Sequence, residues 1–245
     1  MTPIKNHAIL LTLAVSTALT FAQGDPAKTE VWTPVPPIVT PGSGTSAPSD
    51  AIVLFDGTNT AEWENSKAEK IEWTVSDGAL TVKAGTGIIR TKRLFGDCQL
   101  HIEWRTPAAV SGDGQGRGNS GIFLQGKYEL QVLDNYENVT YSNGQAGSLY
   151  KQAIPLVNVC LKPGEWQVYD VIYKAPVFNE DGSLKTPAFI TVLQNGVLVQ
   201  NHYELKGGTE YIGEPKYKKH GAKEAIVLQD HGNDVSYRNI WIREL

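Results

Sequence analysis

Short runs of β-branched and aromatic residues recur along most of the chain, and clusters of Gly, Asn, Asp and Pro separate them. No stretch carries a sustained apolar period of about 3.6 residues, so the pattern does not indicate long amphipathic helices. Many short strands between turn signals are typical of sandwiches and barrels, and the pattern therefore predicts an all-β domain. The runs expected to form strands are residues 52–55, 73–75, 79–83, 99–105, 121–125, 128–133, 167–173, 189–194, 197–200, 225–229 and 240–243.

One hairpin turn is explicit in the dipeptide Asn195-Gly196, which separates two apolar runs. Asn-Gly readily supplies the positive φ angles that both central residues of a type I′ turn require. The sequence therefore predicts two antiparallel strands that meet at this dipeptide. Further turn signals are Asp77-Gly78, Asn143-Gly144 and Asp181-Gly182.

The run at residues 99–105 alternates between apolar and polar side chains, with the period of two that a strand requires. The apolar positions, which we expect to face the core, are Leu100, Ile102 and Trp104. The polar positions, which we expect to face outward, are His101, Glu103 and Arg105.

Residues 128–134 show the same alternation, with Leu130 and Val132 toward the core and Glu129 and Gln131 on the other face. Asn119, Gly121, Phe123 and Gln125 form a similar row. Either row can be an ordinary solvated sheet face. Several strands with amides and carboxylates, and with few of the long lysines usual on open faces, favour a surface that binds carbohydrate.

The first fifty residues differ in composition from the rest of the chain. Lys5 precedes an apolar run at residues 8–21, which has the pattern of a signal peptide cleaved after Ala22; a short transmembrane anchor is the alternative. Residues 23–50 are rich in Pro, Gly, Ser and Thr and are expected to form a linker. Residues 51–245 are expected to form one domain, in a protein that is periplasmic or secreted.

Charge and motif spacing exclude several functions. The formal net charge of −4 provides no basic surface for nucleic acid. The histidines show no ligand-like spacing, so no metal is predicted, although a calcium ion on a loop stays an alternative. Residues 116–121 fit G-x-G-x-x-G, but a strand follows them where a nucleotide-binding helix is required. Cys98 and Cys160 can pair in an oxidising compartment or be two free thiols.

Four further polar residues lie at strand ends or in loops. Gln229 and His231 are at the end of one predicted strand, Asp134 ends another, and Lys151 follows a Gly-rich loop. Three of them have a structural alternative: His231 as a turn residue, Lys151 as plain surface and Asp134 as a turn cap. The aromatic side chains that can stack on a sugar ring include Trp63, Trp166 and Tyr136.

Several segments together resemble the 3-keto-disaccharide hydrolase family. They are Leu54-Phe55-Asp56-Gly57, residues 100–105, 118–123 and 128–134, Pro163-Gly164-Glu165-Trp166, Asn195-Gly196-Val197, residues 228–232 and Arg238-Asn239-Ile240. The resemblance spans residues 51–245 in order. It implies a concanavalin A-like jelly roll in exported bacterial proteins, and action on glycosides that carry a ketone at C3.

Such a substrate implies a particular chemistry, because the ketone acidifies the proton on C2. A base can remove that proton, and the enolate can then expel the group on C1. For this chemistry, strand face and residue type suggest Glu129 or Glu103 as the base, and His231 or Asp134 as the acid or orienting group. The suggested donors to the ketone and hydroxyls are Arg105, Asn119, Gln131, Lys151 and Gln229. No nicotinamide site is visible, so we expect no cofactor, and a separate sugar 3-dehydrogenase as pathway partner.

Two other functions stay open for the same fold. A lectin-like module binds sugar without cleaving it. A retaining glucanase of this fold carries E-x-D-x-x-E or E-x-D-x-E on one strand, whereas Gln131 here stands where that motif has Asp. Because a neutral amide cannot tune a partner carboxylate as an acid does, the glucanase function is the weaker alternative.

Overall fold

The computed structural model describes residues 25–245, so the predicted signal peptide lies outside the described residues. The described chain divides into two compact units between Ile38 and Val39. In the first unit, residues 26–29 form a single 3-10 turn, η1 (Pro26–Thr29), and the side chain of Asp25 accepts a hydrogen bond from the Ala27 N–H. No helix within residues 25–245 is both long and apolar enough to cross a membrane.

The second unit begins at Val39, earlier than the predicted boundary at residue 51. The carbonyl of Thr45 accepts hydrogen bonds from Asn239 Nδ2 at 2.8 Å and Trp241 Nε1 at 3.0 Å. Asp50 pairs with Arg243 at 2.6 Å. Proline and glycine remove helical propensity from this segment, but they do not prevent side chains far along the chain from fixing its backbone. Residues 39–50 are therefore part of the domain and not a linker.

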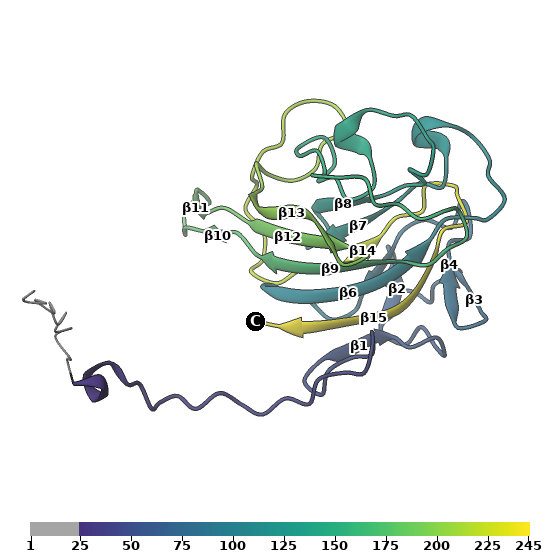
Figure 1. Cartoon of the computed structure of the whole chain (residues 1–245). Coiled ribbons are helices and arrows are strands. Elements are labelled where there is room, and N and C mark those ends of the chain that lie inside the picture. Colours follow the sequence, from purple (N-terminus) through teal and green to yellow (C-terminus); the bar gives the residue numbers. More distant parts are fainter. Residues whose placement is uncertain (1–24) are drawn as a thin grey trace, which may run out of the picture. The chain divides into compact units, whose positions relative to one another are not determined.

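Eight strands form the large sheet, and every pairing in it is antiparallel. Figure 1 shows its long central strands side by side. In spatial order the strands are β13 (Val197–Glu204), β12 (Phe189–Gln194), β9 (Gln167–Lys174), β6 (Cys98–Arg105), β15 (Ser236–Glu244), β4 (Ala79–Thr81) and β3 (Thr74–Ser76), and β1 (Ile52–Phe55) also pairs with β15.

Five shorter strands form the small sheet, which is also antiparallel. In spatial order they are β2 (Trp63–Asn65), β5 (Ile89–Thr91), β14 (Val227–Leu228), β7 (Ser120–Leu124) and β8 (Tyr128–Val132). A separate two-stranded ribbon consists of β10 (Val177–Phe178) and β11 (Leu184–Thr186).

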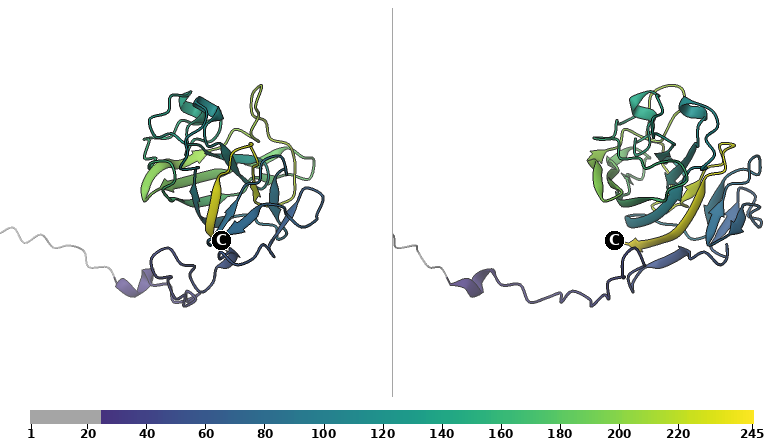
Figure 2. Two further views of the ribbon diagram at one scale, coloured as in Figure 1. Left: turned by 90° about the vertical axis from the view of Figure 1, so that its right-hand side faces the viewer. Right: turned by 45° about the vertical axis from the view of Figure 1, so that its right-hand side comes forward.

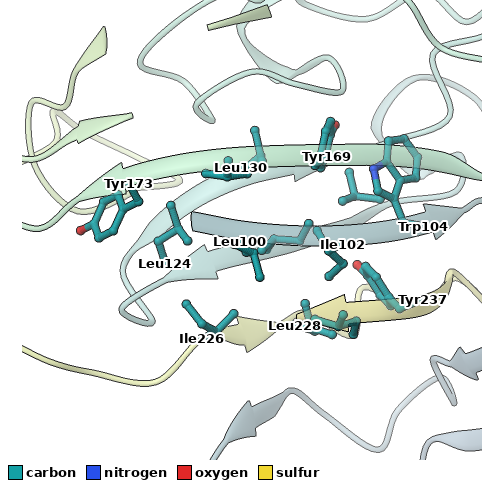
Figure 3. Packing of buried hydrophobic residues seen from close by; sticks show 14 of the residues in the cluster. Leu100, Ile102, Trp104, Leu124, Leu130, Tyr169, Tyr173, Ile226, Leu228 and Tyr237 are labelled. Atoms are coloured by element: carbon teal, nitrogen blue, oxygen red, sulfur yellow. The ribbon is translucent and has the colours of Figure 1, made fainter. Parts of the chain in front are cut away.

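The core lies between the two sheets, as Figure 3 shows for side chains from both of them. Leu100 and Ile102 on β6 pack there with Leu130 on β8 and Leu228 on β14, and all four side chains have no exposed surface. Alternate residues of each strand supply this layer, because a strand turns successive side chains to opposite faces. The predicted all-β fold, a concanavalin A-like jelly-roll sandwich, is confirmed.

The predicted hairpin is confirmed as the connection between β12 and β13. Gln194 pairs with Val197, and the two residues between them, Asn195 and Gly196, have φ angles of 53° and 77°. Both values lie in the region that a type I′ turn requires.

Of the two alternatives for the cysteines, the structure has the free thiols: Cys98 and Cys160 do not pair.

Two short 3-10 turns, η2 (Gly114–Gly116) and η3 (Ser142–Gly144), lie in the long loops that flank β7 and β8. The loops that contain them, in teal, lie on the same side of the domain in both views of Figure 2. Gln115 Nε2 in η2 donates to Thr140 Oγ1 at 2.8 Å and to the Gly144 carbonyl at 2.9 Å. These bonds tie the two loops together and position their side chains over the outer face of the small sheet.

Candidate functional site

A cavity of about 740 Å³ lies on the outer face of the small sheet, over β14, β7 and β8. Its lining comes partly from the sheet and partly from the loops around it. The lining residues are Gln115, Asn119, Phe123, Glu129, Gln131, Tyr141, Tyr150, Thr209, Tyr211, Gln229 and His231.

The alternation of β8 places Glu129 and Gln131 at this cavity, because Leu130 and Val132 are buried in the core. Next to them on β7 is Gly121, whose missing side chain leaves the necessary space. A Cβ atom at residue 121 would lie 2.6 Å from Glu129 Oε1 and 3.3 Å from Gln229 Oε1. Glycine at this position therefore lets the two side chains approach each other across the floor of the cavity.

Glu129 is a buried carboxylic acid without a counter-charge. Its side chain is only 6 % exposed, and among residues 25–245 no cation pairs with it and no donor bonds its carboxylate. Burial disfavours the charged form and raises the pKa of Glu129 to about 8. A carboxyl group with such a pKa can exchange a proton near neutral pH, as a general base or acid must.

The amides beside Glu129 form an ordered network. Gln131 Nε2 donates to Gln115 Oε1 at 3.1 Å and to Asn119 Oδ1 at 3.3 Å. Asn119 Nδ2 in turn donates to the Gln115 carbonyl at 2.7 Å. The Gln229 amide, in contrast, makes no side-chain hydrogen bond within the described part of the chain. It is therefore available to a ligand in the cavity.

The side of the cavity nearest β8 is aromatic. The hydroxyl groups of Tyr141 and Tyr150 are 2.6 Å apart. The Tyr150 N–H donates to the Glu129 carbonyl at 3.2 Å, which fixes the loop against β8. Tyr211 is held by Lys151, whose Nζ donates to the Tyr211 carbonyl at 2.6 Å and lies 4.3 Å from the centre of its ring.

The structure brings five of the sequence-predicted site residues to this cavity: Glu129, Asn119, Gln131, Gln229 and His231. They come from three neighbouring strands of one sheet and from the segments next to those strands. Lys151 lies next to the cavity, where it contacts Tyr211.

Asp134 does not line the cavity. Its carboxylate pairs with Arg117 at 2.7 Å and accepts a hydrogen bond from the Tyr136 N–H at 3.1 Å. The side chain is 3 % exposed. The structure therefore supports the turn-capping alternative for Asp134 over an acid that faces the substrate.

Glu103 and Arg105 are on the wrong side of the sandwich for a role beside Glu129. Both residues point outward from β6, as predicted, but β6 belongs to the large sheet and β8 to the small one. Because the outer faces of the two sheets point in opposite directions, the side chains of Glu103 and Glu129 lie on opposite sides of the sandwich. Alternation along a strand identifies its two faces, but it does not tell which sheet the strand joins.

Glu103 also has the electrostatic surroundings of a structural carboxylate. Its side chain bonds Arg238 at 2.5 Å and Asn239 at 2.9 Å. Burial by itself would raise the pKa of Glu103, but the hydrogen bonds from Asn239 and Arg238 outweigh it and hold this pKa below its usual value.

This assignment predicts the effect of Glu103→Gln. Turnover per folded molecule should stay within twofold of wild type, whereas the free energy of unfolding should fall by about 1–3 kcal/mol, because a charge-assisted hydrogen bond is lost. Urea unfolding at pH 7 and a turnover assay check both parts. Glu72→Gln, which removes the partner of Lys83 on the surface, is the control and should change stability by less than about 1 kcal/mol. A tenfold loss of turnover in Glu103→Gln would contradict the assignment.

The aromatic side chains proposed to stack on sugar are also elsewhere. Trp63 is 2 % exposed and packs in the core, and Tyr136 does not line the cavity. The ring of Trp166 is in contact with the guanidinium groups of Arg105 and Arg238, which lie 4.6 and 4.2 Å from its centre. The aromatic residues at the cavity are instead Phe123 and three tyrosines on loops.

Sequence reasoning missed the loop residues of the site, namely Gln115, Tyr141, Tyr150, Thr209 and Tyr211. Loops have no periodicity that reveals which way a side chain points. Phe123 also lines the cavity, and its direction could be predicted from the sequence because it shares the outward face of β7 with Gly121. Within residues 25–245, no group of three His, Cys, Asp or Glu side chains has the arrangement of a metal site.

Comparison with known proteins extends these findings. A 3-keto-disaccharide hydrolase of Bacteroides thetaiotaomicron is 28 % identical over 240 residues, which covers 79 % of this chain and 78 % of the relative. A crystal structure of a Parabacteroides distasonis protein proposed to be a glycosyl hydrolase is 55 % identical, with a TM-score of 0.88 over 92 % of this chain and 98 % of the other.

A second crystal structure from Parabacteroides distasonis is 21 % identical with a TM-score of 0.59, over 80 % of this chain and 94 % of the other, and supports the fold alone. Residues 50–243 match the family described as the 3-keto-alpha-glucoside-1,2-lyase-like domain. This match covers nearly the whole second unit and confirms the resemblance found in the sequence. The chain therefore belongs to the family of 3-keto-alpha-glucoside-1,2-lyase-like domains.

Proposed function

We propose that this protein cleaves the glycosidic bond of 3-keto glycosides, with Glu129 as the base that removes the C2 proton. The observation that carries the proposal is the state of Glu129. It is the only carboxylic acid among the described residues that line the cavity, and burial raises its pKa to about 8. The family and the relatives named above support a glycosidase-type activity.

A single carboxylic acid suits this substrate better than an ordinary glycoside. Retaining and inverting glycosidases commonly use two carboxyl groups that flank the scissile bond, about 5–9.5 Å apart. Asp134 and Glu103, the other two predicted carboxylates, are engaged by Arg117 and Arg238 outside the cavity. A 3-keto glycoside needs no second carboxylate, because its ketone makes the C2 proton acidic enough for one base.

The reaction proceeds in two bond-breaking steps. The ionised carboxylate of Glu129 takes the C2 proton, and the electron pair of that C–H bond forms an enolate with the C3 oxygen. The enolate then restores the C3 ketone, forms a C1–C2 double bond and expels the oxygen on C1, which takes up a proton. Addition of water across the double bond would convert the lyase product into the hydrolase product.

Polar groups of the cavity suit the other needs of this reaction. The Gln229 amide lies near Glu129 beside Gly121 and is free to donate to the ketone oxygen, where negative charge develops in the enolate. Asn119 and Gln131 are fixed by their hydrogen bonds and present ordered polar groups to the sugar hydroxyls. The step needs no cofactor in this chain, because the substrate ketone accepts the electrons.

The substrate also implies a partner and a compartment. Since the reaction consumes a ketone that it does not make, we propose that a separate sugar 3-dehydrogenase supplies the substrate. We propose export to the periplasm or beyond, from the signal-peptide pattern of Lys5 and residues 8–21.

The proposal is tested with matched 4-nitrophenyl glucosides, with and without a C3 ketone, for both anomers. We expect nitrophenol release from a 3-keto glucoside and none above background from the unoxidised compound. In D₂O, recovered substrate and any 3-keto-glucose formed should carry deuterium at C2, whereas the unsaturated product has no hydrogen on that carbon. Detection of an unsaturated 3-keto sugar would identify a lyase, and 3-keto-glucose alone a hydrolase. Equal cleavage of unoxidised glucosides would refute the proposal, and binding without release would favour the lectin-like alternative.

A further inference from the structure

Two tyrosine hydroxyl groups form a hydrogen-bonded pair in the cavity that holds Glu129. Tyr141 and Tyr150 are 2.6 Å apart at their oxygen atoms, and both line the cavity. Tyr150 is half-buried, whereas Tyr141 is 41 % exposed. The pair therefore connects the interior of the cavity with solvent.

The backbone holds this pair in a fixed place beside β8. The Tyr150 N–H donates to the Glu129 carbonyl, and the neighbouring Leu149 bridges to Leu130 on β8. On the other side, Gly144 leaves room for the ring of Tyr141, since a Cβ at residue 144 would lie 2.1 Å from that ring. These contacts hold both tyrosines in the lining of the cavity that contains Glu129.

A second pocket indicates which end of the substrate meets the tyrosines. Tyr141 and Tyr211 line both the cavity and an adjoining pocket of about 540 Å³, to which Lys151 and Ile212 also contribute. His231, in contrast, follows β14, which β7 separates from β8. A sugar bound over Glu129 with its C1 substituent in the adjoining pocket would have that substituent beside the tyrosines.

We propose that Tyr150 is the acid that protonates the leaving oxygen, and that Tyr141 resupplies its proton from solvent. This assignment rests on the proposed function. As the C1–O bond breaks, both of its electrons go to the leaving oxygen, which takes the Tyr150 hydroxyl proton. Tyr150 then takes the proton of Tyr141, and Tyr141 takes one from water. Glu129 releases the C2 proton to water, so protons balance over one turnover.

The surroundings of Tyr150 fit this role. Burial and the hydrogen bond to Tyr141 raise the pKa of Tyr150, so its hydroxyl keeps its proton until an alkoxide forms beside it. The ammonium group of Lys151 lies 5.6 Å from the ring centre of Tyr150 and 5.9 Å from that of Tyr141. Its positive charge would stabilise the short-lived phenolate.

The test compares two leaving groups, because only a basic one needs an acid. For Tyr150→Phe we expect a loss of about 100-fold to 1,000-fold in the cleavage of methyl 3-keto-glucoside. On 4-nitrophenyl 3-keto-glucoside, whose phenolate leaves without a proton, the loss should stay below about tenfold. Deuterium exchange at C2 should be unchanged within about threefold, since it reports on Glu129. Tyr136→Phe, outside the cavity, is the control.

The possible results separate this assignment from the proposed function. If wild type neither exchanges C2 hydrogen nor cleaves either substrate, the proposed function fails and this assignment falls with it. If wild type exchanges and cleaves but Tyr150→Phe slows both leaving groups equally, or neither, only the assignment of Tyr150 is wrong. The same leaving-group dependence in His231→Asn, and not in Tyr150→Phe, would make His231 the acid.

Discussion

Glu129→Gln should lower kcat on a 3-keto glucoside by about 100-fold to 10,000-fold, the range that a positioned general base contributes. Glutamine keeps the shape of the side chain beside Gly121 but cannot accept the C2 proton. Exchange of deuterium into C2 should therefore disappear together with product release. Both are measured on one sample in D₂O, by proton NMR of the sugar.

Glu103→Gln is the matched control, because it removes an outward carboxylate from a strand of the other sheet. It should retain turnover within twofold per folded molecule. A Glu129→Gln variant that retains more than about a tenth of wild-type turnover would show that another group takes the C2 proton.

The pH dependence of wild type provides a second readout of the same role. Burial raises the pKa of Glu129 to about 8, so at neutral pH most of the free protein carries the protonated, inactive carboxyl group. As pH rises toward 8, the ionised fraction grows, and kcat/KM should rise with it and then level off. A fall of kcat/KM over this range would indicate that the essential form of Glu129 is the acid.

The fold was largely predictable, because most of its strands have an alternation of apolar and polar residues or a turn dipeptide that is visible in the sequence. Runs of alternating residues at 99–105 and 128–133 became β6 and β8 with the expected faces inward. The hairpin at Asn195-Gly196 followed from the backbone angles that this dipeptide favours. The strands that sequence reasoning missed include β2 and β5, which have three residues each and are not joined by a turn dipeptide, whereas the equally short β3 and β4 are joined by the turn signal Asp77-Gly78.

The candidate site was predictable only where it rests on strands. Glu129 and Gln131 follow from the alternation of β8, and Gln229 from its place at the end of β14. Tyr150 and Tyr211 are placed by long-range contacts: the bond from the Tyr150 N–H to β8 and that from Lys151 to the Tyr211 carbonyl. Such contacts leave no local pattern in the sequence.

The comparison of Glu103 with Glu129 gives the physical reason why a face alone does not define a site. Both are buried carboxylates on outward faces, with 4 % and 6 % of their surface exposed. Arg238 and Asn239 bond Glu103, whereas no cation among residues 25–245 pairs with Glu129. Which of them is poised for chemistry depends on partners that come from distant parts of the chain.

An unsatisfied buried carboxyl group should also destabilise the fold, and Glu129→Gln should therefore stabilise it. In the folded protein, burial raises the pKa of Glu129 to about 8 from a usual value of 4.5. Below pH 4.5 Glu129 keeps its proton in both the folded and the unfolded state, so its titration does not change the free energy of unfolding. Between pH 4.5 and 8 only the unfolded state releases it, so the stability of wild type falls as pH rises.

The free energy of unfolding of Glu129→Gln should therefore exceed that of wild type by close to zero at pH 4 and by roughly 3 kcal/mol at pH 7, since each pKa unit corresponds to about 1.4 kcal/mol. Above pH 8 this difference should level off, because both states of wild type are then ionised. Urea unfolding of wild type and variant at a series of pH values measures the difference, which cancels the titration of all other groups.

Glu103→Gln should show the opposite sign in the same experiment. Its hydrogen bonds hold the pKa of Glu103 below 4.5, so Glu103 stabilises the fold above that pH and loses this contribution as pH falls. Its removal should therefore be most destabilising at neutral pH. If the effect of Glu129→Gln were the same at pH 4 and pH 8, Glu129 would not have a raised pKa, and its place as the base would fall as well. If the change in the free energy of unfolding varies with pH in opposite directions for the two variants, the destabilisation by Glu129 comes from ionising its buried carboxyl group. That ionised form is the one the proposed base requires.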